Sequence, residues 1–205
     1  MNWRLSKIQY PIYNLGPGKR IGIWVQGCNL ACEGCINQML WSKRKGKYLP
    51  VYEVFNIIKN LEEDYDGITI SGGEPFQQYE QLIAFIYLIK TQTKLNIQCY
   101  TGYELNELST LYQDGLYLKF IDYLVDGRYV QSQHENENIK GSKNQNYYQI
   151  INGEAIKCDS DFKSKKWSVN VSLEGDIYMA GIPKKSDIKN LISDLQRKGI
   201  HKIFK

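Results

Sequence analysis

Histidine, methionine and proline are scarce in this sequence, and long apolar runs are missing. Its 205 residues include two histidines, three methionines and five prolines. No stretch is apolar for long enough to span a membrane, and the start lacks the basic and apolar pattern of a secretory signal. Without such a signal, five cysteines do not indicate a disulfide framework. These absences argue against membrane-embedded and secreted proteins, and we expect a cytoplasmic location.

Positively and negatively charged residues are nearly balanced in number. The net charge is +4, and the composition is 42% hydrophobic and 23% charged. Such a composition and length are typical of one globular domain with a full hydrophobic core. The densest basic cluster, residues 43–47, could touch phosphate or an acidic partner, but it suits a solvated loop better. We therefore expect neither a membrane nor nucleic acid as a partner.

The cysteines fall into an informative pattern. Cys28, Cys32 and Cys35 have the spacing CxxxCxxC and follow an apolar run. Three thiolates from one loop can bind a four-iron cubane and leave one iron open to a non-protein ligand, whereas electron-transfer clusters normally take four cysteines. A structural zinc ion would need a further Cys or His nearby, but His134 and His201 are far along the chain. The spacing predicts a [4Fe–4S] cluster, with zinc or a redox thiol pair as alternatives.

A pair of glycines marks a second candidate ligand site. A β-branched stretch leads into five turn-like residues, Ser71, Gly72, Gly73, Glu74 and Pro75. Adjacent glycines let the backbone come close to a ligand and adopt dihedral angles closed to other residues. The structural alternative is a tight turn from a strand into a helix, with Pro75 at the first helical position. Gly102, just after a predicted strand at 96–100, is a similar point of close approach.

A third candidate stretch belongs to a predicted strand at 120–127. Asp126 lies near the carboxyl end of this strand, where its carboxylate could accept a hydrogen bond from a ribose or orient a cation. Arg128 could pair with a carboxylate or a phosphate. The alternative is a salt bridge beside a polar capping loop at 140–145. We expect His134, between these segments, on an exposed loop.

Together these stretches resemble the radical S-adenosylmethionine (SAM) superfamily. The resemblance implies that Cys28, Cys32 and Cys35 hold the cluster, while SAM binds the open iron through its amino and carboxylate groups. It also implies contacts to SAM from Ser71, Gly72, Gly73, Glu74, Gly102, Asp126 and Arg128. The paired motifs Val-Asp-Gly-Arg-Tyr and Gly-Ser-Lys-Asn-Gln, at 125–129 and 141–145, are similar to those of the activating proteins of anaerobic ribonucleotide reductases.

The resemblance implies an enzyme that cleaves SAM reductively to methionine and a 5′-deoxyadenosyl radical. The radical would take a hydrogen atom from a glycine of a glycyl-radical partner, an anaerobic ribonucleoside-triphosphate reductase, with a flavodoxin- or ferredoxin-type protein as electron donor. Two alternatives stay open. One is the same chemistry on a small molecule, nucleoside or peptide, and the other is a non-enzymatic metal-cluster module that docks on a partner.

Strand and helix patterns alternate between residues 20 and 130, which predicts parallel βαβ units. With the resemblance, they predict an α/β fold, a partial (β/α) barrel of about five or six units with the site at the carboxyl ends of its strands. Residues 1–145 would form this core after an irregular lead-in at 1–20. Residues 146–205 would add a small β-hairpin and a helix, packed on the same domain. Asn152 and Gly153 after a strand at 147–151 predict a hairpin turn, and a second turn is predicted at 174–176.

Overall fold

The computed structural model describes residues 1–135, 139–159, 167–171, 177–181, 183 and 185–197. Its strands are β1 (Asn2–Ile12), β2 (Arg20–Val25), β3 (Lys47–Pro50), β4 (Gly67–Gly72), β5 (Asn96–Tyr100), β6 (Tyr123–Asp126), β7 (Asn146–Ile151), β8 (Glu154–Lys157), β9 (Trp167–Val171) and β10 (Ile177–Gly181). Its α-helices are α1 (Val51–Lys59), α2 (Tyr79–Gln92), α3 (Leu105–Leu111), α4 (Leu116–Phe120) and α5 (Lys185–Arg197).

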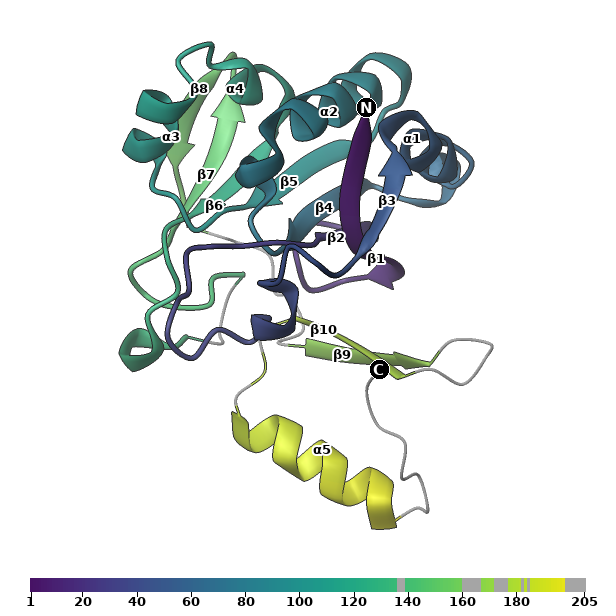
Figure 1. The fold of residues 1–205 in the computed structure, drawn as a ribbon, viewed down its shortest axis with the longest axis vertical. Coiled ribbons are helices and arrows are strands. Elements are labelled where there is room, and N and C mark those ends of the chain that lie inside the picture. Colours follow the sequence, from purple (N-terminus) through teal and green to yellow (C-terminus); the bar gives the residue numbers. More distant parts are fainter. Residues whose placement is uncertain (136–138, 160–166, 172–176, 182, 184, 198–205) are drawn as a thin grey trace.

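Most strands belong to one sheet with the order β3-β1-β2-β4-β5-β6-β7-β8 (Figure 1). The central strands β2, β4, β5 and β6 are parallel, and helices connect them. This arrangement confirms the predicted α/β fold. Among the described residues the parallel part has four strands, fewer than the about five or six units predicted from the barrel type. The difference arises because β1, β3, β7 and β8 are antiparallel to their neighbours.

Alternating side chains give the sheet two different faces. Ile23, Ile68 and Ile97 pack against the helices α1 to α4, which lie on one side of the sheet (Figure 1). Trp24, between Ile23 and Val25 in β2, points to the other face and packs there with Ala180 of β10. The helices and the β9–β10 hairpin therefore cover opposite faces of the sheet.

The first residues of the chain form a long strand, so the predicted irregular lead-in at 1–20 was wrong for its first half. β1 pairs with β2 on one side and with β3 on the other. Its register against β2 shifts between Leu5 and Lys7 and again between Gln9 and Ile12. Each bulge turns the following side chains to the other face of the sheet. The sequence therefore lacks the alternation by which a strand is recognised.

Arg20 is wholly buried at the start of β2 and ties the first turn of the chain to the sheet. Its guanidinium donates to Thr69 Oγ1 at 2.7 Å, to the Pro17 carbonyl at 2.7 Å and to Asn96 Oδ1 at 2.6 Å. It also donates to the Ile68 carbonyl. Burial lowers the pKa of Arg20 to about 10, so the side chain is still a cation at neutral pH. Oxygen atoms of neutral groups surround this cation.

The predicted hairpin at Asn152 and Gly153 is confirmed. Their φ angles of 54° and 83° give the left-handed backbone of a two-residue turn between β7 and β8. This hairpin extends the main sheet beyond β6, immediately after the predicted boundary at residue 145. The division into a core of 1–145 and an appendage of 146–205 stays a prediction.

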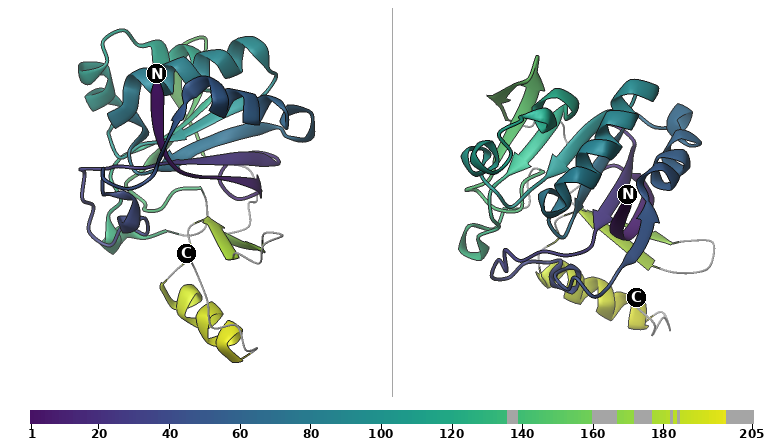
Figure 2. Two further views of the ribbon diagram at one scale, coloured as in Figure 1. Left: turned by 45° about the vertical axis from the view of Figure 1, so that its right-hand side comes forward. Right: turned by 45° about the horizontal axis from the view of Figure 1, so that its top comes forward.

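β9 and β10 form a separate two-stranded sheet, and α5 lies beyond it in both views of Figure 2. These elements match the predicted C-terminal hairpin and helix, while the predicted turn at 174–176 lies outside the described residues. The strand predicted at 120–127 begins later, at Tyr123, because the helix α4 extends to Phe120. None of the helices in the described ranges is long and apolar enough to cross a membrane.

Candidate functional site

The carboxyl ends of the parallel strands meet at one edge of the sheet and border a single cavity of about 820 Å³. The loop with the three cysteines follows β2, and the glycine pair ends β4. Gly102 follows β5, and Gly127 follows β6. All four segments contribute to the lining of the cavity. The topology thus brings together stretches that lie up to a hundred residues apart in the sequence.

Backbone hydrogen bonds fix both ends of the cysteine loop. The N–H groups of Gly27 and Cys28 donate to the carbonyls of Leu40 and Trp41 at 2.7 and 3.1 Å. The side chain of Gln77, in the turn after β4, accepts from the Asn29 N–H at 3.2 Å. The loop between these anchors has no helix or strand until the short 3₁₀ turn at 38–40. Its shape therefore depends on contacts with the neighbouring strand ends.

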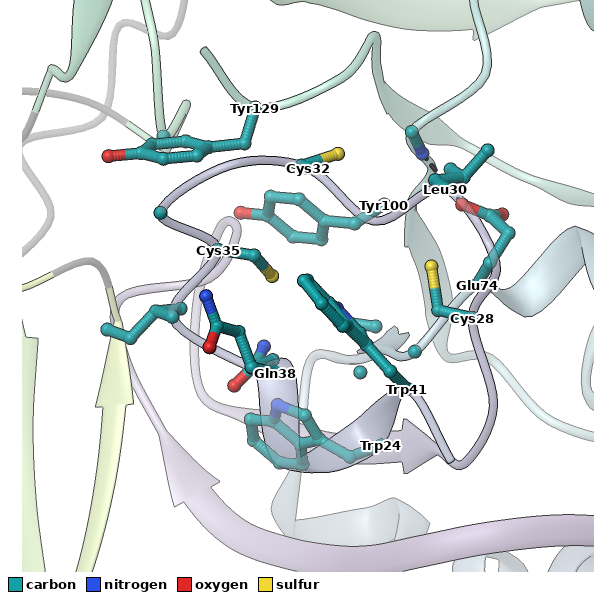
Figure 3. Close-up of a pocket in the computed structure, with 18 of the residues that line it drawn as sticks. Trp24, Cys28, Leu30, Cys32, Cys35, Gln38, Trp41, Glu74, Tyr100 and Tyr129 are labelled. Atoms are coloured by element: carbon teal, nitrogen blue, oxygen red, sulfur yellow. Dashed lines mark hydrogen bonds between the residues drawn. The ribbon is translucent and has the colours of Figure 1, made fainter. Parts of the chain in front are cut away.

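The thiols of Cys28, Cys32 and Cys35 all line the cavity, and Figure 3 shows their sulfur atoms around one space. Burial raises the pKa of the Cys28 and Cys32 thiols. A backbone hydrogen bond from Tyr129 and the charge of Arg128 lower the pKa of Cys32 and oppose this effect. Among the described residues, no three Cys, His, Asp or Glu side chains converge closely enough to hold one metal ion. A cubane places each thiolate on a different iron, so its ligands need not meet at one point.

Two glycines form close contacts that a side chain would prevent. Gly72 has a φ of +114°, and a Cβ there would lie 2.6 Å from Val25 backbone atoms. A Cβ on Gly73 would collide with the backbone of Gly27, at the base of the cysteine loop. The Gly73 N–H donates to the Val25 carbonyl at 2.8 Å, and the Glu74 N–H donates to the Gly27 carbonyl at 2.9 Å. The glycine pair therefore seats the cysteine loop against the end of β4.

The comparisons with known proteins agree with this geometry. Residues 14–148 match the family described as 4Fe-4S single cluster domain. The chain belongs to this family of radical SAM enzymes. Its cofactors are a [4Fe–4S] cluster and SAM. Three thiols around one space, bordered by exposed glycine backbone, fit that pair of cofactors.

Two curated relatives carry the name anaerobic ribonucleoside-triphosphate reductase-activating protein. The protein of Enterobacteria phage T4 is 30% identical over 142 residues, which are 67% of this chain and 88% of the relative. The protein of Haemophilus influenzae is 34% identical over 137 residues, 63% of this chain and 87% of the relative. The solved structure of QueE from Escherichia coli aligns with 50% of this chain and 53% of its own, at 19% identity and a TM-score of 0.39. That likeness is too remote to inform the site.

Glu74 is a buried carboxyl at the wall of this cavity. Its Oε1 accepts from the Phe76 N–H at 3.0 Å and from the Thr101 hydroxyl at 2.8 Å, and its Oε2 accepts from the Gly102 N–H at 2.8 Å. Burial raises the pKa of Glu74 to about 7, although these hydrogen bonds act to lower it. The carboxyl group therefore holds the ends of β4 and β5 together at the cavity wall, on the Leu30 side in Figure 3.

Asp126 and Arg128 do not line the cavity with the other predicted residues. Asp126 is buried, and its carboxylate accepts from the Leu105 N–H at 2.8 Å and from Asn146 Nδ2 at 2.9 Å. Arg128 forms a salt bridge with Glu107 at 2.8 Å, and both side chains are more than one-third exposed. These contacts match the alternative of a salt bridge and a capping interaction. Direct contact of either residue with SAM stays a prediction.

The two motifs at 125–129 and 141–145 hold one another in place. Gln145 accepts from the Gly141 N–H at 2.8 Å and donates to the Gly127 carbonyl at 2.7 Å. The Asn144 side chain donates to the Arg128 carbonyl at 2.9 Å. The pair of motifs therefore forms one hydrogen-bonded wall of the cavity. This mutual bonding explains in physical terms why the two motifs occur together.

Sequence reasoning missed several residues at the cavity. His134 is half-buried, lines the cavity and lies 3.0 Å from the Tyr129 hydroxyl through its Nδ1, so its predicted place on an exposed loop was wrong. The neighbouring positions 136–138 lie outside the described residues. Trp24 and Met179 also line the cavity. The alternation in β2 could have indicated Trp24, whereas no local signal indicates Met179.

Proposed function

We propose that this radical SAM enzyme generates the glycyl radical of a partner anaerobic ribonucleoside-triphosphate reductase. The observation that carries the proposal is the single cavity that unites the three thiols with the glycine-rich ends of β4 and β5. The names of relatives at 30% and 34% identity, over 88% and 87% of their lengths, support the choice of partner. A cytoplasmic location is part of the proposal, since thiols that bind iron require a reducing compartment.

In this proposal Cys28, Cys32 and Cys35 hold the [4Fe–4S] cluster. SAM lies against the exposed backbone and side chains at the strand ends, contributed by Ser71, Gly72, Gly73, Glu74 and Gly102. The cofactors supply the reductive cleavage of SAM to methionine and a 5′-deoxyadenosyl radical that takes a hydrogen atom from the substrate. A flavodoxin- or ferredoxin-type protein supplies the electron.

The protein's own contribution is position and exclusion of water. Hydrogen-atom transfer requires no general base, but it requires the reacting carbon atoms to be close and aligned. Glu74 links Thr101 and Gly102 to the end of β4 and so fixes the glycine edge of the cavity. The backbone of Tyr129 lowers the pKa of the Cys32 thiol, and backbone groups near sulfur ligands tune the reduction potential of a cluster.

The test is anaerobic reconstitution with iron and sulfide, followed by reduction and addition of SAM. 5′-Deoxyadenosine is measured with and without the candidate reductase, and the reductase is examined by electron paramagnetic resonance. We expect cleavage that rises with the reductase, together with a glycyl radical signal. Cleavage that is indifferent to the reductase would contradict the activase function.

A second candidate function is the same chemistry on a small molecule, nucleoside or peptide. The specific observation in its favour is that Met179, Ala180 and Ile188, from the C-terminal hairpin and α5, help to line the cavity. A cavity with this additional wall can surround a small substrate on one more side. Failure of a well-formed cluster to cleave SAM at all would instead favour a module that only docks on a partner.

A further inference from the structure

The C-terminal hairpin and α5 form one wall of the cavity that holds the three cysteines. Met179, Ala180 and Gly181 of β10 line it, together with Pro183 and Ile188. All of these residues are apolar or lack a polar side chain. The cysteine loop and the strand ends contribute other parts of the same lining. A substrate that reaches the cavity therefore meets an apolar surface contributed by the C-terminal segment.

This wall is attached to the body of the protein by buried contacts. Asn14 is 2% exposed, and its side chain donates to the Ala180 carbonyl at 2.7 Å and to Ser168 Oγ at 3.3 Å. Ala180 is itself 2% exposed and packs with Leu15 and Trp24. A buried amide and apolar packing therefore hold β10 on the face of the sheet opposite the helices. The wall is a fixed part of the cavity.

The wall lies outside the part of the chain that the family match covers. That match ends at residue 148, whereas β9 begins at Trp167. The aligned region is 88% of the phage T4 relative but 67% of this chain. The surface contributed by β10 and α5 is therefore an addition to the part of the chain that matches the family.

Charge around the cavity points to the chemistry of the substrate. The described residues that line it include one lysine, Lys7, and no arginine. Lys7 is held with its Nζ 4.8 Å from the centre of the Trp24 ring, and burial lowers its pKa. Phosphate groups are normally bound by several arginine or lysine side chains together, whereas the described lining offers one lysine, which is held against a tryptophan ring. An uncharged substrate segment suits this lining better than a phosphorylated one.

We propose that the wall of β10 and the start of α5, centred on Met179, is the substrate-contacting surface of this enzyme and selects an uncharged peptide segment over a phosphorylated small molecule. The proposal rests on the proposed function, because it assigns the surface against which the glycine segment of the reductase lies. Methionine suits this role, since its flexible and polarisable side chain adapts to the shape of a peptide. Met179 is thus a specificity-determining residue.

The test compares Met179→Glu, Met179→Leu and the control Asn190→Glu, which places the same charge on an exposed position of α5. Reductase-dependent formation of 5′-deoxyadenosine is measured against reductase concentration. SAM affinity is measured separately by titration of the reconstituted protein before reduction, so that SAM is not cleaved. We expect Met179→Glu to raise the KM for the reductase about tenfold and to leave SAM affinity within about twofold. Met179→Leu and the control should stay within about twofold of wild type in both measurements.

An unchanged KM in Met179→Glu would overturn the proposal. Stimulation of SAM cleavage in the wild-type enzyme by ATP would also overturn it, because the wall would then accept a phosphorylated substrate. Limited proteolysis of Met179→Glu checks that the hairpin remains docked. Met179→Leu retains the apolar contact. Its KM for the reductase therefore tests the proposal even if the charge in Met179→Glu disturbs folding. Failure of the proposed function differs from both outcomes, since it appears as wild-type cleavage that neither the reductase nor ATP stimulates.

Discussion

At the residue scale, Glu74 makes the stability of the protein depend on pH. Its pKa is about 7 in the folded protein and 4.5 as an ordinary carboxyl, so the folded state binds more protons between these values. Stability from this group is therefore fully present below pH 4.5 and is lost as the pH rises through 7. The shift corresponds to about 3 kcal/mol.

We predict that Glu74→Gln removes this part of the pH dependence. The free energy of unfolding of the cluster-free protein is measured with denaturant from pH 5 to 8. Over this range it should fall by about 3 kcal/mol less in the variant than in wild type. Glu80→Gln, on an exposed position of α2, is the matched control. A slope for Glu74→Gln equal to that of the control would show that the buried carboxyl does not titrate in this range.

Gly73 supports a second prediction at this scale. Gly73→Ala would place a Cβ against the backbone of Gly27, and the cysteine loop would have to move. We expect less than about half of the wild-type iron content after reconstitution, because the displaced loop no longer holds the three thiols in position around the cavity. Gly115→Ala is the control, because its position has a positive φ but open space and costs only about 1 kcal/mol of backbone strain. Full iron loading of Gly73→Ala would contradict the account of the glycine pair.

The cysteine and glycine motifs could be found in the sequence because their residue types and spacing carry the chemistry. The roles of Asp126 and His134 could not. A carboxylate at a strand end looks the same whether it faces a ligand or bonds to the backbone of the next helix, as Asp126 does with Leu105. The burial of His134 against Tyr129 depends on how two loops fold over each other.

At the scale of elements, Arg20 connects the first turn, β4 and β5. Removal of the guanidinium leaves buried oxygen acceptors of Pro17, Thr69 and Asn96 without their donor. We predict that Arg20→Met lowers the free energy of unfolding by about 3 to 5 kcal/mol, measured with urea. Arg44→Met, on the exposed loop before β3, should change it by less than about 0.5 kcal/mol. Equal effects of the two substitutions would show that the hydrogen bonds of Arg20 to the first turn, β4 and β5 do not stabilise the protein.

Strands and helices could be predicted where their apolar residues follow a regular pattern along the sequence. The parallel strands were found because their apolar residues belong to uninterrupted runs that end in glycine or another turn residue. β1 was missed because two register shifts against β2 interrupt its alternation. The helix α4 was missed because it has only five residues, from Leu116 to Phe120, too few to show a helical period.

At the scale of the whole molecule, the main sheet and the C-terminal wall respond differently to truncation. A chain of residues 1–158 retains β7 and β8, which complete the main sheet. A chain of residues 1–145 lacks both strands, and with them Tyr147, which is 4% exposed and packs on Val125. We predict cooperative unfolding for the longer chain, and a loss of about 3 kcal/mol or more of stability for the shorter one.

Circular dichroism during denaturation measures this difference, and the full-length protein is the reference. Chains of equal stability would support the predicted core of 1–145. Loss of folding in both would mean that the wall of β9, β10 and α5 is needed for the sheet itself, which contradicts its description as an attached surface.

We infer that Cys28, Cys32 and Cys35 hold one four-iron cluster in the same cavity that receives SAM. The most direct measurement is electron paramagnetic resonance of the reconstituted, reduced protein before and after addition of SAM, together with iron analysis. We expect about four irons per chain and a cluster signal that changes when SAM is added. A signal that SAM leaves unchanged, or a protein that retains zinc and no iron, would contradict it.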